Sequence, residues 1–117
     1  MREITCSTIT DAIKKMCIEA ATILPQDVEK ALSQKHDEED SALAKKTLQV
    51  LMDNAKLAQE KQMPICQDTG MAFVYVTMGQ EVHITGGSLN EAIQEGVRQG
   101  YTEGYLRKSV VKDPLFE

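Results

Sequence analysis

Residues 40–61 carry the spacing that most constrains the fold of this chain. Apolar side chains recur there in steps of four and three, which place them on one stripe of a helix. They are Ala44, Leu48, Leu51, Ala55 and Ala58, and the stripe is widened by Leu43, Val50 and Leu57. Two shorter helices are predicted before it, one over residues 10–24 and one beginning at Pro25. Helices this short gain most of their stability from packing, so the sequence predicts a bundle of about three helices over residues 1–62.

The pattern changes at Pro64, which disfavours helix at the preceding residue. Residues 71–77 are apolar on both faces and predict a buried strand, whereas residues 81–85 alternate as a half-buried strand does. Residues 78–80 between them predict the turn of a β-hairpin. Ser88 and Glu91 fit a capping box that begins a last helix. We therefore expect an α+β fold, with the β-hairpin and the last helix over residues 63–117.

Three glycines, Gly96, Gly100 and Gly104, lie four residues apart on one face of this last helix. Each interior glycine costs about 1 kcal/mol relative to alanine, so the three together cost roughly 3 kcal/mol. We expect the close approach of another backbone along this face to compensate for that cost.

Composition argues against several classes of function. Thirteen Lys and Arg against eighteen Asp and Glu give a net charge of −5, which disfavours binding to nucleic acid. The longest apolar run, 71–76, is too short to span a membrane, and the N-terminus lacks the apolar stretch of a signal peptide. A cytoplasmic protein is expected. Its three cysteines match no zinc-site spacing, and a structural disulfide is not expected in a reducing compartment.

Reactive side chains concentrate in the run Cys66-Gln67-Asp68-Thr69-Gly70. A thiol, an amide, a carboxylate and a hydroxyl occupy consecutive positions beside the expected strand, where a fold can both fix and expose catalytic groups. The other interpretation is a small buried cysteine next to an Asp-Gly turn. The chemistry of these residues alone does not decide between the two.

Four segments, 64–70, 82–84, 86–89 and 100–116, resemble the class I fumarate hydratases and L-tartrate dehydratases. The resemblance covers essentially the whole chain and corresponds to the N-terminal part of the alpha subunit. It implies a hydro-lyase that interconverts fumarate and malate, or dehydrates tartrate. In this family three cysteines hold a [4Fe–4S] cluster whose fourth iron has no protein ligand and acts as a Lewis acid on the substrate.

The resemblance also implies roles for individual residues. Cys66 matches the first cluster ligand of the family. Gln67 and Asp68 match residues that contact the substrate, and Asp68 is the candidate catalytic residue, which would move a proton or orient the hydroxyl. Arg107 matches an arginine that binds a substrate carboxylate, a role that suits its planar fork. Lys108 is a second candidate for the same electropositive corner.

In the family the other two cluster cysteines and the proposed catalytic base belong to sequence beyond residue 117. We therefore expect a fragment of a larger domain that is catalytically silent alone and works with the remainder of the alpha subunit and a beta subunit, as a homo-oligomer. Without that remainder, the glycine face is expected to be exposed and to cause self-association. Cys17 lies in an apolar helical stripe and is expected to fill space, and Cys6 has no counterpart in the family.

Two other classes of function remain open from the sequence. A helical interaction module without chemistry would explain the amphipathic helices but would leave the cysteine motif as an accident. A thiol enzyme with Cys66 as nucleophile would need an activating base. The candidates are His36 and His83, and the sequence places neither beside Cys66.

Overall fold

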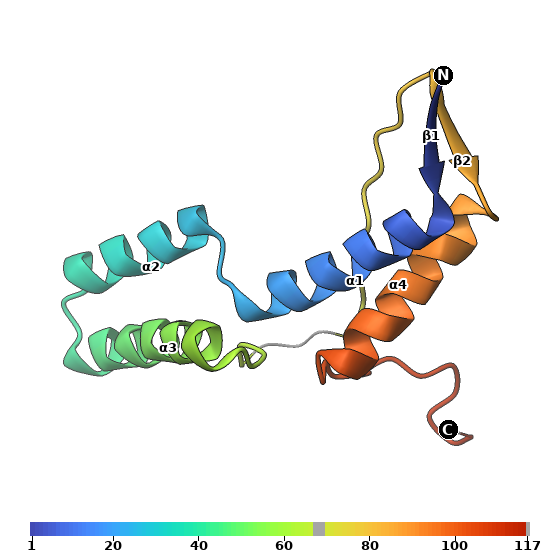
Figure 1. Ribbon diagram of the computed structural model, residues 1–117. Coiled ribbons are helices and arrows are strands. Elements are labelled where there is room, and N and C mark those ends of the chain that lie inside the picture. The colour runs from blue at the N-terminus through green and yellow to red at the C-terminus, as the bar shows by residue number, and fades with distance from the viewer. Residues whose placement is uncertain (67–69, 117) are drawn as a thin grey trace. The chain divides into compact units, whose positions relative to one another are not determined.

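The computed structural model describes residues 1–66 and 70–116 and has the predicted α+β class. Its elements, in chain order, are β1 (Arg2–Thr5), α1 (Cys6–Thr22), α2 (Gln26–Glu38), α3 (Ala42–Lys61), β2 (Val82–Thr85) and α4 (Leu89–Glu103), as shown in Figure 1. The chain divides into two compact units, Ala20–Gln67 and Met1–Glu19 with Asp68–Glu117. Within the described residues, no helix has both the length and the apolar character needed to cross a membrane.

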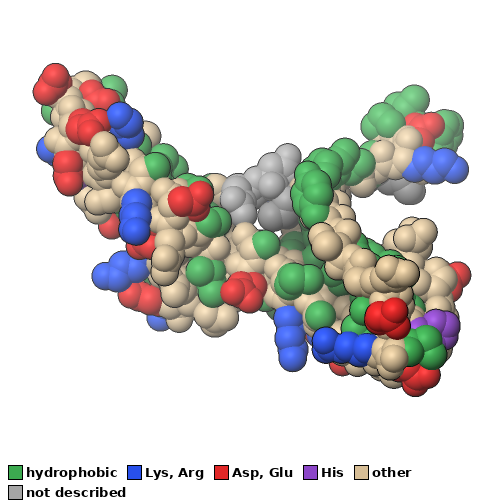
Figure 2. Space-filling view, turned by 90° about the horizontal axis from the view of Figure 1, so that it is seen from above, with side chains coloured by type: hydrophobic (Ala, Val, Ile, Leu, Met, Phe, Trp, Pro, Cys, Tyr) green, Lys and Arg blue, Asp and Glu red, His purple; other side chains and the backbone are tan. Residues whose placement is uncertain are grey.

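The unit Ala20–Gln67 is a helical hairpin in which α2 and α3 pack against each other (Figure 1). Pro25 immediately precedes α2, and its carbonyl oxygen accepts a hydrogen bond from the Glu29 N–H at 3.0 Å. The Ser41 hydroxyl caps α3 by accepting from the Ala44 N–H at 3.3 Å. The α3 helix was predicted correctly, but its apolar stripe only in part, since Ala58 is buried whereas Leu43, Val50, Leu51 and Leu57 are exposed. Acidic and basic side chains are interspersed over the outside of the hairpin (Figure 2).

The other unit consists of two strand–helix pairs that run side by side in the same direction (Figure 1). β1 leads directly into α1, and β2 leads after a short turn into α4. The strands pair in parallel, with Arg2 opposite Val82 and Thr5 opposite Thr85. Ser88 caps α4 as the capping box predicted, since its hydroxyl accepts from the Glu91 N–H at 3.3 Å.

The glycine face of α4 is covered by α1. A Cβ added at Gly96 would lie 2.6 Å from the Ile13 Cβ and 2.8 Å from the Thr10 carbonyl oxygen, and one at Gly100 would lie 2.9 Å from the Cys17 Cβ. At distances this short a Cβ would force the neighbouring atoms of α1 to shift, so glycine is favoured at both positions. The predicted close approach of a second backbone is therefore confirmed. The expectation that this face is exposed is wrong, because the chain supplies its own cover.

The predicted β-hairpin is also wrong. Residues 71–79 form no strand, and β2 pairs instead with β1, for which the sequence pattern gave no prediction. A turn does form at the predicted place, where the Val82 N–H donates to the Gly79 carbonyl oxygen at 3.2 Å. The packing of α1 on α4 explains the outcome, because it brings together the two segments that precede those helices.

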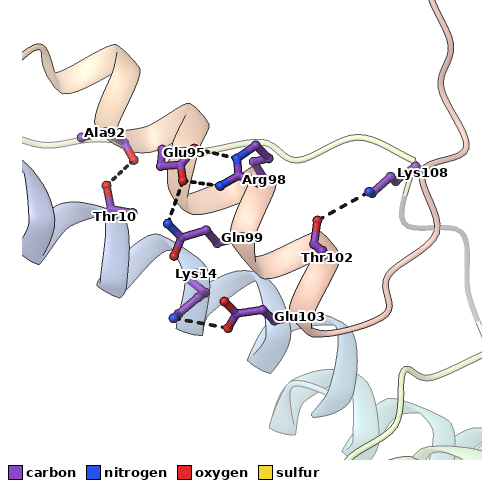
Figure 3. Close-up of polar contacts among 9 residues, drawn as sticks. All are labelled: Thr10, Lys14, Ala92, Glu95, Arg98, Gln99, Thr102, Glu103 and Lys108. Atoms are coloured by element: carbon purple, nitrogen blue, oxygen red, sulfur yellow. Dashed lines mark hydrogen bonds and ion pairs between the residues drawn. The ribbon is translucent and has the colours of Figure 1, made fainter.

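Some polar contacts join α1 to α4, and others lie within α4 (Figure 3). The Thr10 hydroxyl of α1 donates to the Ala92 carbonyl oxygen of α4 at 2.9 Å, and Lys14 lies 3.3 Å from the Glu103 carboxylate. Within α4, the Glu95 carboxylate accepts from Arg98 Nε and from the Gln99 amide, each at 2.7 Å. These hydrogen bonds, above all those from Arg98, lower the pKa of Glu95 to about 2.

Substitution of Gly96 by alanine tests the close approach of the helices. The gain in helix propensity of about 1 kcal/mol is outweighed by overpacking against Ile13 and the Thr10 carbonyl, so the free energy of unfolding should fall by about 2 kcal/mol. Urea denaturation followed by circular dichroism measures the change. Gly79→Ala is the matched control, because its Cβ would meet only Val82 Cγ2, at an ordinary 3.7 Å. An equal response of the two variants would contradict this packing.

The Glu95 contacts predict a pH dependence of stability. The pKa of Glu95 is about 2 in the folded chain and about 4.3 in an unfolded one. Because the folded value is the lower one, the stabilisation is complete above the unfolded pKa and is lost as the pH falls towards 2. The urea midpoint of Glu95→Gln should therefore fall less than that of the unmodified chain between pH 6 and pH 3. High salt should reduce the difference between the two urea midpoints, since the Glu95–Arg98 pair is exposed. Parallel pH profiles of the two chains at low salt would contradict the lowered pKa of Glu95.

Candidate functional site

The cysteine motif begins where α3 ends and the chain reverses. Gln62 adopts a left-handed conformation with φ 53°, and the Met63 N–H donates to the Ala58 carbonyl oxygen at 2.9 Å. This arrangement satisfies a carbonyl group that the helix end would otherwise leave unpaired. Pro64 follows and prevents the helix from resuming. The motif is therefore held close to the last turn of α3.

Two hydrogen bonds fix the backbone at Cys66 within the helical-hairpin unit. The Ile65 N–H donates to the Ala21 carbonyl oxygen in the last turn of α1 at 2.8 Å, and the Cys66 N–H donates to Asn54 Oδ1 of α3 at 2.9 Å. The residue itself is exposed. The interpretation of Cys66 as a small buried cysteine is therefore wrong. The structure shows a thiol on an anchored backbone, accessible from outside this chain.

The two residues that follow Cys66, Gln67 and Asp68, lie outside the described residues, as does Thr69. The predicted contacts of Gln67 and Asp68 with a substrate, and the catalytic role of Asp68, therefore stay predictions. Gly70, where the described chain resumes, is partly buried.

Arg107 follows α4 in the other unit. After Gly104 the chain turns through Tyr105, which has φ 54°, and the Leu106 N–H donates to the Tyr101 carbonyl oxygen at 3.0 Å. The buried Leu106 side chain anchors this turn and leaves Arg107 on the surface. The next residue, Lys108, donates to the Thr102 hydroxyl at 3.5 Å (Figure 3). Cys66 and Arg107 belong to different units, and their convergence on one site stays a prediction.

The other two cysteines, Cys6 and Cys17, both lie on α1 and contact residues at or near α4. Cys17 is half-buried on α1 against Gly100, and this burial raises the pKa of its thiol. The packing agrees with its predicted space-filling role. Cys6 begins α1, and its thiol lies 3.7 Å from the Ser88 carbonyl oxygen. Across residues 1–66 and 70–116, no three His, Cys, Asp or Glu side chains are grouped as metal ligands would be.

The placement of His36 bears on the thiol-enzyme alternative. His36 lies in the last turn of α2, where its Nδ1 is 3.2 Å from the Asp37 carboxylate. Cys66 follows the last turn of α3, at the other end of the hairpin (Figure 1). The length of α2, roughly 20 Å at 1.5 Å per residue, therefore separates this imidazole from the thiol. His36 is not the activating base for Cys66.

Asn54 lies near the motif and was not among the predicted site residues. Its side-chain oxygen is the acceptor for the Cys66 N–H. A signal was available, since Asn54 lies four residues before the buried Ala58 and so shares its helix face. A polar side chain on a packed face needs a hydrogen-bond partner. The sequence could not indicate that this partner is the backbone of Cys66.

Comparison with known proteins gives consistent matches. A family model described as fumarate hydratase (Fumerase) matches residues 10–117. A protein of Methanocaldococcus jannaschii provisionally named L(+)-tartrate dehydratase subunit alpha is 38% identical over 104 residues, 88% of this chain and 36% of its own length. The L(+)-tartrate dehydratase subunit alpha of Escherichia coli K12 is 27% identical over 104 residues, 89% of this chain and 34% of its own length.

A protein of Geobacillus stearothermophilus provisionally named fumarate hydratase class I is 31% identical over 102 residues, 86% of this chain and 20% of its own length. The chain thus spans from a fifth to about a third of the length of these relatives.

Thiol alkylation tests the different surroundings of Cys66 and Cys17. Iodoacetamide reacts with the thiolate, so we expect rapid modification of the exposed Cys66 and modification of Cys17 that is severalfold slower, since burial both shields that thiol and raises its pKa. Peptide mass spectrometry over a time course at pH 8 measures both rates. The difference should vanish in concentrated guanidinium chloride. Equal rates in the native chain would contradict the described placement of the two thiols.

Proposed function

The chain belongs to the family of class I fumarate hydratases and L-tartrate dehydratases, and from this we propose that it is part of a hydro-lyase acting on a small dicarboxylate. The observation that carries the proposal is the family match over residues 10–117, which includes the whole cysteine motif and Arg107. The reaction would add water across the double bond of fumarate to give malate, or remove water from tartrate. The location would be cytoplasmic.

We propose that Cys66 supplies one of three cysteine ligands to a [4Fe–4S] cluster. Its exposure and its two backbone anchors support this role, because a ligand must be both accessible from outside the chain and held in place. When bound, such a cluster supplies an open iron that acts as a Lewis acid. The other two cysteines would come from sequence outside residues 1–117, since Cys6 lies against the Ser88 carbonyl oxygen and Cys17 packs against Gly100 of α4.

The residues after Cys66 would act on the substrate. Gln67 and Asp68 immediately follow the anchored cysteine in sequence, so they would lie within reach of a substrate placed beside it. The Gln67 amide would donate to a substrate oxygen. Asp68 would orient the hydroxyl group or carry the proton that moves between the substrate and water.

Arg107 would bind a substrate carboxylate. Removal of a proton next to a carboxylate places extra negative charge on it, and a guanidinium donates two parallel hydrogen bonds to such a group. The buried Leu106 supports this role, because it fixes the backbone next to Arg107. Lys108 would add positive charge in the same region.

The partners follow from the relatives. Two of them are named as alpha subunits, and we propose that this chain works with the remainder of an alpha subunit and with a beta subunit, in a homo-oligomeric assembly. The chain alone would be inactive, because one thiolate does not hold a cluster.

The test is a cysteine exchange in the complete assembly, reconstituted with iron and sulfide without oxygen. Cys66→Ser should lose the visible absorption of the cluster together with the hydration of fumarate and the dehydration of tartrate. Cys17→Ser is the matched control and should keep both, since Cys17 packs against α4. Full cluster content and turnover in Cys66→Ser would exclude the ligand role. Comparison of the two substrates on the unmodified assembly decides between fumarate and tartrate.

A further inference from the structure

Asn54 lies well inside α3, where asparagine is an unfavourable residue. It forms helix less readily than alanine, because its short side chain competes with the backbone for hydrogen bonds. The neighbouring Asp53 is exposed and accepts a hydrogen bond from the Gln49 amide of the same helix at 2.9 Å. Asn54 is half-buried instead, and its side-chain oxygen accepts from the Cys66 N–H at 2.9 Å. The side chain that weakens the helix therefore makes its contact outside the helix.

Two consecutive peptide groups of the cysteine motif are attached to two different helices. The Ile65 N–H donates to the Ala21 carbonyl oxygen at the end of α1, and the next N–H in the chain, that of Cys66, donates to Asn54 of α3. Ala21 is 4% exposed, so the first acceptor belongs to the packed part of the helical hairpin. The second acceptor lies one helical turn before the buried Ala58. Both acceptors are therefore on well-packed turns of their helices.

These two hydrogen bonds together determine where the Cys66 Cα atom lies. A peptide group is planar and includes the Cα atoms of both residues that it joins. The bond to Asn54 holds the plane that ends at the Cys66 Cα, and the bond to Ala21 holds the plane before it. The residue is exposed, so packing contributes little to its placement. The sulfur is two bonds from this Cα, and its position follows from the few torsions that remain free.

We propose that Asn54 is a positioning residue for Cys66, whose backbone it holds so that the thiol is presented at a fixed place to the [4Fe–4S] cluster. The inference rests on the proposed ligand role of Cys66 and adds a residue that acts through this ligand. Neighbours that orient a metal ligand by hydrogen bonds matter for binding, since their loss commonly lowers metal affinity or activity about 10–100-fold. The Asn54 side chain occupies this place with respect to Cys66.

Two substitutions in α3 separate the positioning of Cys66 from the stability of the helix. Asn54→Ala removes the acceptor but introduces a better helix former, so the urea midpoint of the chain should change little. The Cys66 amide should nonetheless exchange its hydrogen about fivefold faster in an NMR measurement, which is the equivalent of one ordinary hydrogen bond. Ser41→Ala is the matched control, because it removes the N-terminal cap of the same helix. It should lower the urea midpoint without changing the exchange at Cys66.

The same variants test the effect on the cluster in the complete assembly, reconstituted with iron and sulfide without oxygen. Asn54→Ala should lose iron to a chelator at least about tenfold faster than the unmodified assembly. The visible circular dichroism of its cluster, which responds to the arrangement of the ligands, should also change. Asn54→Asp keeps an oxygen acceptor at this position and should restore both properties. Ser41→Ala should leave both unchanged.

Several outcomes would overturn the positioning role. They are an unchanged exchange rate of the Cys66 amide in Asn54→Ala, unchanged iron loss and spectrum in that variant, a failure of Asn54→Asp to restore them, and equal changes in Ser41→Ala. Cys66→Ser separates this inference from the proposed function. If Cys66→Ser loses the cluster while Asn54→Ala behaves as the unmodified assembly, only the positioning role fails. If Cys66→Ser keeps the full cluster, the ligand role fails and the positioning role fails with it.

Discussion

The close approach of α1 and α4 along three glycines is the constraint on which one of the two units depends. Without side chains at these positions the two backbones come near enough for Ile13 to pack over Gly96 and for the Thr10 hydroxyl to reach the Ala92 carbonyl. The strands that precede the helices are brought together as a result, and the parallel pairing of β1 with β2 follows. The roughly 2 kcal/mol of helix propensity that the interior Gly96 and Gly100 forgo is thus offset by the close packing of α1 against α4.

The cysteine motif is positioned by a different kind of interaction. The Ile65 N–H donates to a carbonyl oxygen at the end of α1 and the Cys66 N–H donates to an asparagine of α3, and both bonds hold the backbone while Cys66 remains exposed. Neither bond uses the thiol itself. A metal ligand or substrate contact requires this arrangement, because the backbone hydrogen bonds hold the residue in place and leave the Cys66 thiol available to a partner.

Local signals were read correctly from the sequence. The helices, the Ser88 cap and the glycine face depend on residues within a few positions of each other, and each appears where expected. The strand pairing failed because hydrophobic alternation gives the face of a strand but not its neighbour, and the true neighbour of Val82 is Arg2. The hydrogen bond from the Cys66 N–H to Asn54 was missed because the sequence pattern indicates that Asn54 lies on a packed helix face but not which residue it contacts there. The roles of Gln67, Asp68 and Arg107 depend on family resemblance and stay predictions.

The separation of β1 from β2 along the chain has a consequence for biosynthesis. About eighty residues must be added after β1 before its partner strand exists, which takes roughly 4–16 s at 5–20 residues per second. During that time α1 has left the ribosome with Ile13 and its neighbours uncovered. The apolar side of α1 therefore stays uncovered in the nascent chain for several seconds, until α4 has been made and packs against it.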